Sequence, residues 1–233
     1  PLPPEGGLQA AFPGPQWKPG QSLHSKVLNN LADAWNLPRS ILASLDYSYP
    51  LRQGLLMARH GQEFADSFVT GFRAFFDDDL ARKTMAQIQG VPRGTLHISP
   101  LEGGKLLDRE EQFLSRFLGK IPLARRSQQA SIVFINKLRA DVYDTVTKAW
   151  LRSGYTPTAN DLEGLGNYVS RATGYGSLGA FENAAGTLAQ GFFSPRLLLS
   201  RIQAPGYMFH SSAKVRQEAI KDYDVIFLGK CKI

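Results

Sequence analysis

Residues 122–154 read PLARRSQQASIVFINKLRADVYDTVTKAWLRSG, and this stretch decides the fold. Its apolar residues recur at steps of three and four, which places them along one face of an α-helix. Pro122 suits the first turn of a helix, because that turn does not need its missing N–H group, and Gly154 suits the end. The sequence therefore predicts one long helix over about 122–153. The apolar positions on its face are Ile132, Phe134, Ile135, Leu138, Val142, Val146, Ala149 and Trp150.

The same helical period continues on both sides of this stretch, in shorter segments that end at proline, glycine or a polar break. Strand-type alternation is nearly absent, so the predicted fold class is all-α, with an irregular multi-helix architecture. A short extended stretch is expected at 95–98. Further helices are predicted at 22–35, 38–45, 51–59, 62–76, 80–89, 108–118, 158–173, 180–191, 195–203 and 212–228.

Proline and glycine also divide the chain into regions. Residues 1–20 contain six prolines and four glycines, a composition that excludes a helix and predicts an extended N-terminal arm over 1–21. A helical subdomain is expected at 22–90 and a loop at 91–107. A second helical subdomain, built on the long helix, is expected at 108–233.

Composition limits the classes of protein that fit. Of the 233 residues, 43% are apolar, which suffices for a core, but no run approaches the ~20 apolar residues of a membrane span. Cys231 is the only cysteine, which excludes an internal disulfide and a cysteine zinc site and favours synthesis in a reducing cytoplasm. The net charge of +7 has two explanations: a basic solvated surface, or contact with a polyanion such as nucleic acid.

No pattern of chemically active residues points to an active site. The four histidines lack the spacing of metal ligands, and each is expected to be a surface or capping residue. Residues 174–179, GYGSLG, fit the G-x-G-x-x-G pattern of nucleotide-binding loops, but they follow a predicted helix instead of a strand. A flexible hinge or close helix packing is therefore expected there. We expect no catalytic residue, no cofactor and no metal site, and hence no enzyme.

Two further clusters have structural explanations. The aspartates at 77–79 lack the spaced ligands and the glycine of a calcium loop, and they are expected to cap the helix that follows. The phenylalanines of 62–76 share one broad helical face and are expected to lie in the core. They are Phe64, Phe68, Phe72, Phe75 and Phe76.

Basic residues are the candidates for contact with nucleic acid or with a partner. The alternative is that they pair with carboxylates on the same helix. For Arg125 and Arg126 this alternative is weaker, because no acidic residue lies within four positions of either. The spread of positive charge along helices favours non-specific phosphate contacts over the recognition of bases. The candidate contact residues are Arg109, Arg116, Lys120, Arg125, Arg126, Lys148 and Arg152.

Five stretches, taken in order, carry a resemblance to a known family. They read LPRSILASLD at 37–46, YPLRQG at 49–54, FINKLRAD at 134–141, ATGYGSLG at 172–179, and FFSPR at 192–196 followed by SRI at 200–202. Together they resemble a segment of the large polyvalent proteins of tailed phages and related mobile elements, over roughly 37–223. The resemblance implies a helical module of a very long protein that is carried in or with the virion. Some proteins of this kind are packaged in the head and enter the host with the DNA.

The resemblance supplies no catalytic residue, but it draws attention to six positions. We expect their side chains to make buried or half-buried polar contacts that fix helix packing, because a buried arginine is costly unless it is paired. The positions are Arg52, Arg139, Asp141, Pro195, Arg196 and Arg201.

The expected function is that of a non-enzymatic virion structural protein, either internal, ejection-related or head-associated. Its partners would be other virion proteins or copies of itself. It would be made in the host cytoplasm and reside in the virion, near packaged DNA. The alternative is a non-specific DNA-binding accessory module that contacts the phosphate backbone and is delivered with the genome. An enzyme is the third alternative, and it would require a pocket with perturbed titratable groups.

Overall fold

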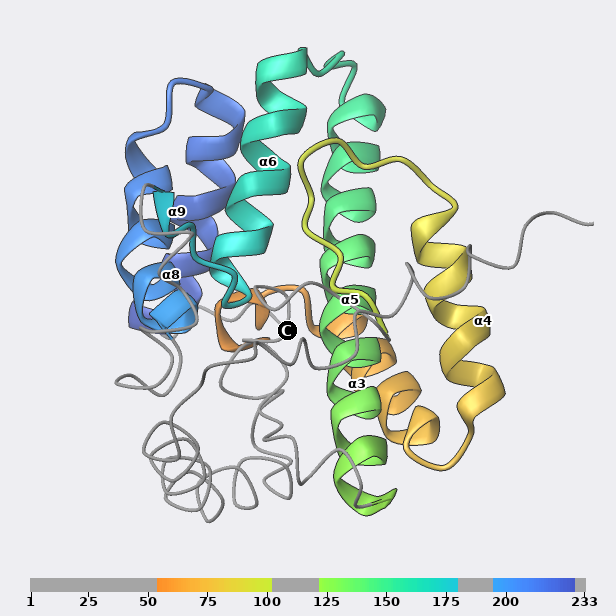
Figure 1. Ribbon diagram of the computed structural model, residues 1–233. Coiled ribbons are helices and arrows are strands. Elements are labelled where there is room, and N and C mark those ends of the chain that lie inside the picture. The colour runs from red at the N-terminus through yellow and green to blue at the C-terminus, as the bar shows by residue number, and fades with distance from the viewer. Residues whose placement is uncertain (1–53, 102–121, 180–194, 229–233) are drawn as a thin grey trace, which may run out of the picture.

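The computed structural model describes residues 54–101, 122–179 and 195–228. Within these ranges the chain forms six α-helices and two short 3-10 helices, and it contains no strand (Figure 1). The predicted all-α fold class is therefore confirmed. The predicted N-terminal arm and the helices predicted at 22–35, 38–45, 108–118 and 180–191 lie outside the described residues.

Helix α5 (Pro122–Arg152) is the long helix that the sequence predicts, and it lies in the middle of the molecule. Helices α3 (Gly61–Ala74) and α4 (Asp78–Gln89) pack on one side of it, and α6 (Ala159–Ala172) packs on the other (Figure 1). This position explains why the centre of α5 is buried on nearly all sides, polar side chains included. Gly154 follows the helix with a φ of 78°, a left-handed conformation that glycine adopts without strain.

The turn between α3 and α4 is fixed by a helix cap, as predicted. The Asp77 carboxylate accepts hydrogen bonds from the backbone N–H groups of Asp79 and Leu80, both at 2.9 Å. The next two aspartates fall in the first turn of α4, where the helix dipole favours negative charge. Helix α4 therefore begins two residues earlier than its apolar pattern indicates.

The face that α3 turns to the core differs from the predicted one. Phe64 and Phe68 pack edge-to-face on Phe134, with ring centroids 5.4 and 6.3 Å apart, but Phe72 and Phe76 are 53% and 65% exposed. A core position for these last two phenylalanines was therefore a wrong prediction. The fully buried stripe of α3 consists of small residues, Ser67, Gly71 and Ala74, which let α3 approach α5 closely. Apolar character alone pointed to the neighbouring face.

Two helices complete the fold on the far side of α6. They are α8 (Pro195–Gly206) and α9 (Ala213–Leu228), joined through the 3-10 helix η5 (Tyr207–Phe209) (Figure 1). Both α8 and α9 contact α6. The helices predicted at 158–173, 195–203 and 212–228 are thus present with small shifts of their ends. The helix predicted at 51–59 is described only at its end, where the 3-10 helix η1 (Leu55–Met57) stands.

Loop 90–101 passes from α4 across α5 to α6 (Figure 1). It contains no strand, so the extended stretch predicted at 95–98 has no strand partner. Side chains of the two helices satisfy its backbone instead: Ser170 Oγ accepts from His97 N–H at 2.9 Å, and the Asn136 amide pairs with Ser99. Residues 96–99 are therefore packed against the two helices, whereas most of residues 90–95 are exposed.

One core cluster joins the beginning and the end of the described chain. Leu56 and Met57 of η1 are buried in the same cluster as Phe134 of α5 and as Val215 and Tyr223 of α9. A second, smaller cluster lies between α4 and α5. No described helix combines the length and the apolar character that crossing a membrane requires.

Candidate functional site

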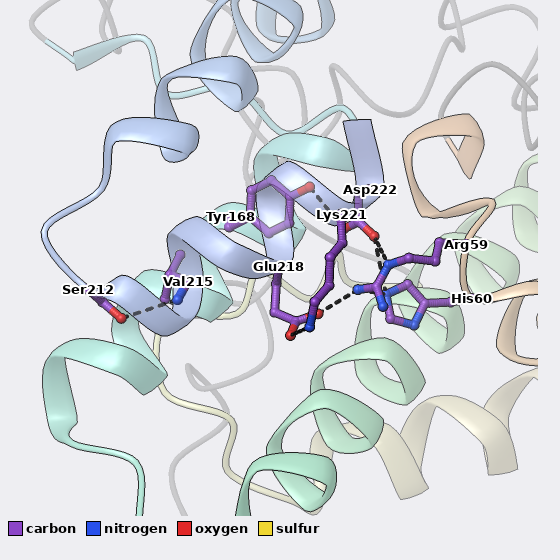
Figure 2. Close-up of polar contacts among 8 residues, drawn as sticks. All are labelled: Arg59, His60, Tyr168, Ser212, Val215, Glu218, Lys221 and Asp222. Carbon is purple, nitrogen blue, oxygen red and sulfur yellow. Dashed lines mark hydrogen bonds and ion pairs between the residues drawn. The ribbon is translucent and has the colours of Figure 1, made fainter. Parts of the chain in front are cut away.

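Six ionisable side chains from three distant parts of the chain meet where α9 packs on the rest of the molecule (Figure 2). We call them the ionic cluster. The turn before α3 supplies an arginine and a histidine, α6 supplies a tyrosine, and one stretch of α9 supplies two carboxylates and a lysine. The members are Arg59, His60, Tyr168, Glu218, Lys221 and Asp222.

Arg59 bridges the two carboxylates of α9. Its Nε donates to Asp222 Oδ1 at 2.6 Å and its Nη2 donates to Glu218 Oε2 at 2.5 Å. Glu218 and Asp222 lie four residues apart, one turn of helix, so a single guanidinium reaches both. The other oxygens also have donors, because Lys221 donates to Glu218 Oε1 at 2.9 Å and the Tyr168 hydroxyl donates to Asp222 Oδ2 at 2.9 Å. Each carboxylate oxygen therefore has a partner.

His60 lies behind this bridge and is buried. Its Nε2 is 3.2 Å from Arg59 Nη2 and 3.6 Å from Asp222 Oδ1. A guanidinium has only donors, so the contact with Arg59 requires Nε2 to be the acceptor and places the imidazole proton on Nδ1. Burial lowers the pKa of His60, although Asp222 acts in the opposite direction. The imidazole is therefore neutral, and two cations face two carboxylates.

Burial shifts the pKa of the two carboxylates differently. It raises the pKa of Asp222, with Arg59 opposing it most strongly. Burial alone would also raise the pKa of Glu218, but Lys221 and Arg59 together outweigh it, and the pKa of Glu218 is lowered. Through the bonds of Arg59 and Tyr168, the cluster connects α9 to the turn before α3 and to α6. All four carboxylate oxygens are hydrogen-bonded within the cluster, an arrangement suited to holding these segments together.

A second polar cluster is built around Tyr175, and two of the positions named by the resemblance meet there. The His97 and Tyr175 rings are stacked, with centroids 3.4 Å apart. Arg196 lies over the Tyr175 ring at 4.7 Å and donates to the carbonyl oxygen of Gly176 at 3.1 Å. Arg139 lies 5.9 Å from the ring centroid. Both arginines are fully buried, and we call this group the Tyr175 cluster.

Thr173 anchors Arg139 at the end of α6. Arg139 Nε donates to Thr173 Oγ1 at 2.7 Å and its Nη2 donates to the Thr173 carbonyl oxygen at 3.3 Å. Arg139 belongs to α5, so these bonds hold the C-terminal end of α6 against the long helix. Cation–π and hydrogen-bond contacts together replace water around the buried guanidinium.

The glycine pattern at 174–179 serves close helix packing, one of the two alternatives that the sequence leaves open. Gly176 N–H donates to the carbonyl oxygen of Arg196 at 3.1 Å. A Cβ atom on Gly176 would lie 2.3 Å from that same oxygen and 2.6 Å from Ser200 N, so only glycine fits against α8. The pattern follows helix α6, and the described residues contain no strand that could precede a nucleotide-binding loop.

The remaining positions named by the resemblance are placed less closely together. Asp141 is half-buried and pairs with Lys137, one turn away on α5, at 2.5 Å. Arg201 is exposed on α8, and Pro195 is the first residue of that helix. Arg52 lies outside the described residues.

The candidate contact residues do not form one patch where the structure describes them. Arg125 and Arg126 are exposed near the start of α5, and Arg125 lies 3.7 Å from Asp78 of α4, a pairing that chain spacing could not indicate. Lys148 and Arg152 are exposed at the other end of α5. Lys148 lies 22 positions after Arg126, a distance of about 33 Å at 1.5 Å per residue. Arg109, Arg116 and Lys120 lie outside the described residues.

Sequence reasoning missed the ionic cluster. It treated His60 as a surface or capping residue, whereas the ring is buried; it stands at the N-terminal boundary of α3 but its side chain caps nothing. A signal was available, because Glu218 and Asp222 interrupt the buried stripe of α9. Their partner Arg59 is 159 residues from Glu218 and could not be inferred from spacing. His210 is half-buried before α9, where its Nδ1 accepts from Ser212 N–H at 3.1 Å; the helix itself is capped by Ser212 Oγ, which accepts from Val215 N–H.

The described residues contain no group of three or more histidine, cysteine, aspartate or glutamate side chains placed to hold a metal ion. Comparison with protein-family models, with curated proteins and with solved structures finds no match for this chain. The likeness to large polyvalent proteins thus rests on the quoted stretches of sequence alone.

Proposed function

We propose that this chain is a non-enzymatic structural protein of a phage virion, internal, ejection-related or head-associated, which assembles with copies of itself or with other virion proteins near packaged DNA. The observation that carries the proposal is a set of exposed apolar side chains on α8, η5 and α9. Ile202, Phe209 and Phe227 are 74%, 84% and 76% exposed. The phage assignment rests on the sequence resemblance.

The exposed set follows helical spacing, which supports a contact surface over scattered exposure. Leu198 and Ile202 are one turn apart on α8, and Ile220 and Phe227 are two turns apart on α9. Burying one such side chain contributes about 1.5–3 kcal/mol, so a few of them suffice to hold a partner. Both α8 and α9 contact η5, and exposed apolar side chains on adjacent elements are the kind of surface that protein–protein contacts use. We call these residues, with Phe209, the apolar surface.

Light scattering after size-exclusion chromatography tests the assembly role. The wild-type chain is expected to form a defined oligomer at low and at high salt without DNA, because apolar contacts are not screened by salt. The double variant I202S/F227S is expected to be a monomer. Leu151→Ser, at an exposed apolar position on α5, serves as the control and is expected to keep the oligomer. A wild-type monomer at both salts would contradict self-assembly.

Mass spectrometry of purified particles tests the virion part of the proposal. The chain is expected in particles of the phage that encodes it, after nuclease and protease treatment of their outer surface. Absence from such particles would refute a virion role.

One observation favours the alternative of a DNA-binding module. Lys148 and Arg152 are like charges one turn apart, an arrangement that costs a few tenths of a kcal/mol on an isolated helix. Asp144, one turn earlier, is already held by Arg93 at 2.8 and 2.9 Å. Within the described residues, neither Lys148 nor Arg152 has a carboxylate at ion-pair distance. DNA phosphates would relieve the repulsion.

The salt dependence of binding tests this alternative. The binding constant for duplex DNA is measured by fluorescence anisotropy at several salt concentrations. In the variant K148Q/R152Q, the negative slope of its logarithm against log salt is expected to become shallower by about 2, since each phosphate contact contributes about 0.9. Lys83→Gln, at an exposed position on α4, is expected to leave the slope unchanged. Equal slopes in the wild type and K148Q/R152Q would show that Lys148 and Arg152 do not contact DNA phosphates.

A further inference from the structure

We propose that the ionic cluster is a pH-sensitive clasp: it holds α9 on the rest of the molecule while His60 is neutral, and it loosens when His60 takes up a proton. The residues of the ionic cluster are not part of the apolar surface, although both sets include residues of α9. It rests on the geometry around Arg59 and on the charge balance of the cluster.

Arg59 is the link through which the turn before α3 holds α9. It reaches Glu218 and Asp222 at 2.5 and 2.6 Å, and both carboxylates are buried. Breaking a buried ion pair leaves an uncompensated charge, which is strongly unfavourable. The attachment of this part of α9 therefore depends on the orientation of the Arg59 guanidinium.

His60 takes part in setting that orientation. Its neutral Nε2 accepts from Arg59 Nη2 at 3.2 Å. Protonation turns this acceptor into a donor and places two cations side by side. The new N–H would face Asp222 Oδ1 at 3.6 Å, the same oxygen that Arg59 Nε uses. His60 would thus compete with Arg59 for one carboxylate oxygen while repelling it.

The charge count gives the same result. With neutral His60, Arg59 and Lys221 balance Glu218 and Asp222. Within the cluster, a protonated imidazole adds a third positive charge to two negative ones; Glu63 of α3, outside the cluster, offsets part of this excess. Because His60 and both carboxylates are buried, water screens this excess poorly while α9 stays docked. Releasing α9 exposes the groups to water and removes the conflict.

Charged groups face His60 from each element packed against it. Glu63 of α3, Asp222 and Glu218 favour the protonated form, whereas burial, the largest effect, and Arg59 oppose it. Tyr168 of α6 and Lys221 act through their contacts with the two carboxylates. The net effect is that the pKa of His60 is lowered below its ordinary value of 6.5 while α9 is docked.

The sign of the pH dependence follows from this shift. Burial lowers the pKa of His60 below its ordinary value of 6.5 while α9 is docked, so a state in which water reaches the imidazole binds the proton more tightly below about pH 6.5. Docking therefore weakens as the pH falls through this range. Glu218, whose pKa is lowered, acts in the same direction only below its ordinary value of 4.5. Asp222, whose pKa is raised, acts in the opposite direction, because its protonation favours the docked state.

Hydrogen exchange detected by mass spectrometry tests the clasp at about pH 7.5 and about pH 5.5, with rates corrected for intrinsic exchange. In the wild-type chain, acidification is expected to reduce the protection of α9 amides several-fold more than that of α5 amides. The variant H60Q keeps an acceptor for Arg59 but cannot be protonated. Its α9 protection is expected to be the same at both pH values.

His210→Asn is the matched control, because His210 is the imidazole at the start of α9, outside the cluster, and asparagine can keep the acceptor for Ser212 N–H. It is expected to show the full wild-type response. The proposal would be overturned if α9 protection in H60Q still fell on acidification as in the wild type. It would also be overturned if α9 protection in H210N no longer fell. If H60Q does not fold, the wild-type imidazole titration by nuclear magnetic resonance decides: α9 amide shifts must follow the His60 midpoint, and a different midpoint would refute the clasp. The exchange is measured in the I202S/F227S background, so that assembly through the apolar surface does not contribute to α9 protection and the proposed function is tested separately.

Discussion

At the scale of single residues, Asn136 shows how one buried side chain can take the place of a strand partner. Its Nδ2 donates to the carbonyl oxygen of Ser99 at 2.7 Å, and its Oδ1 accepts from Ser99 N–H at 2.9 Å. Both residues are buried, so the two backbone groups of Ser99 have no water to replace a lost bond. Loop 90–101 is thereby fixed to α5.

Asn136→Leu is expected to lower the free energy of unfolding by about 2–4 kcal/mol, because it leaves two buried backbone groups without partners. Urea denaturation measures the change. Gln87→Leu, on the exposed face of α4, is the control and should change stability by less than about 0.5 kcal/mol. Equal effects of the two substitutions would show that the Asn136 bonds contribute nothing.

Ser67, unlike Asn136, is a buried polar residue whose side chain makes no hydrogen bond among the described residues. Its side chain is fully buried on α3. Ser67→Ala is expected to raise the free energy of unfolding by about 1 kcal/mol, since it removes an unsatisfied polar group and favours the helix. Ser170→Ala should have the opposite sign, because Ser170 Oγ bonds both His97 N–H and the Gly166 carbonyl. The two signs are compared by thermal denaturation.

At the scale of elements, Asp161 joins the starts of two helices. Its carboxylate accepts from Thr158 N–H and from the Tyr155 hydroxyl next to α6, and it accepts from the Ser212 hydroxyl at the start of α9, at 2.5 Å. Ser212 Oγ in turn accepts from Val215 N–H at 3.2 Å. Burial alone would raise the pKa of Asp161, but the hydrogen bonds from Ser212, Tyr155 and Thr158 outweigh it and hold this pKa below its ordinary value of 3.8.

This lowered pKa predicts the pH range in which Asp161 matters. The stability that it contributes is complete above about pH 3.8 and is lost as the pH falls toward the folded-state pKa, since the unfolded chain then binds the proton more tightly. Asp161→Asn is expected to cost about 2 kcal/mol at neutral pH and progressively less in acid. Glu163→Gln, exposed on the same helix, should show neither effect. Chemical denaturation across pH measures both; a constant difference would contradict the charge-based cap.

The contact between the 174–179 segment and α8 gives a second prediction at this scale. Gly176→Ala would place a Cβ atom against the backbone of Arg196 and Ser200, so α8 must move, with an expected loss of about 2–4 kcal/mol. Gly206→Ala, in the same helix, meets no atom within 4 Å and is expected to be neutral or slightly stabilising. Calorimetry compares the two variants. A neutral Gly176→Ala would show that this packing is not required.

At the scale of the whole molecule, the main core cluster extends from η1 to α9 and so crosses the boundary predicted at 91–107. At about pH 7.5, where α9 stays docked, elements that share one core are expected to unfold together. Met57→Ala is expected to lower the free energy of unfolding by about 2–5 kcal/mol. Hydrogen exchange should then show the same decrease in opening free energy for the amides of α3, α5 and α9. Leu55→Ala, an exposed neighbour, is the control. A loss confined to α3 would instead support two independent subdomains.

The sequence by itself determined the fold class and most helix ends among the described residues, because these depend on interactions between residues close in the chain. The period of apolar residues places α5, and the Asp77 cap and Gly154 mark where helices begin and end. Such effects involve only a few neighbouring residues, so a linear sequence contains them.

The tertiary structure alone decided which faces are buried and which polar residues meet. Arg59 pairs with Glu218, 159 positions away in the chain, and Arg125 of α5 pairs with Asp78 of α4. Phe72 is exposed although it shares the pattern of Phe68, because α3 approaches α5 through small residues. Helical spacing states which side chains share a face, but it does not state what lies opposite that face. The ionic cluster depends on what lies opposite each helix face, since burial and charge pairing arise only where distant segments pack together.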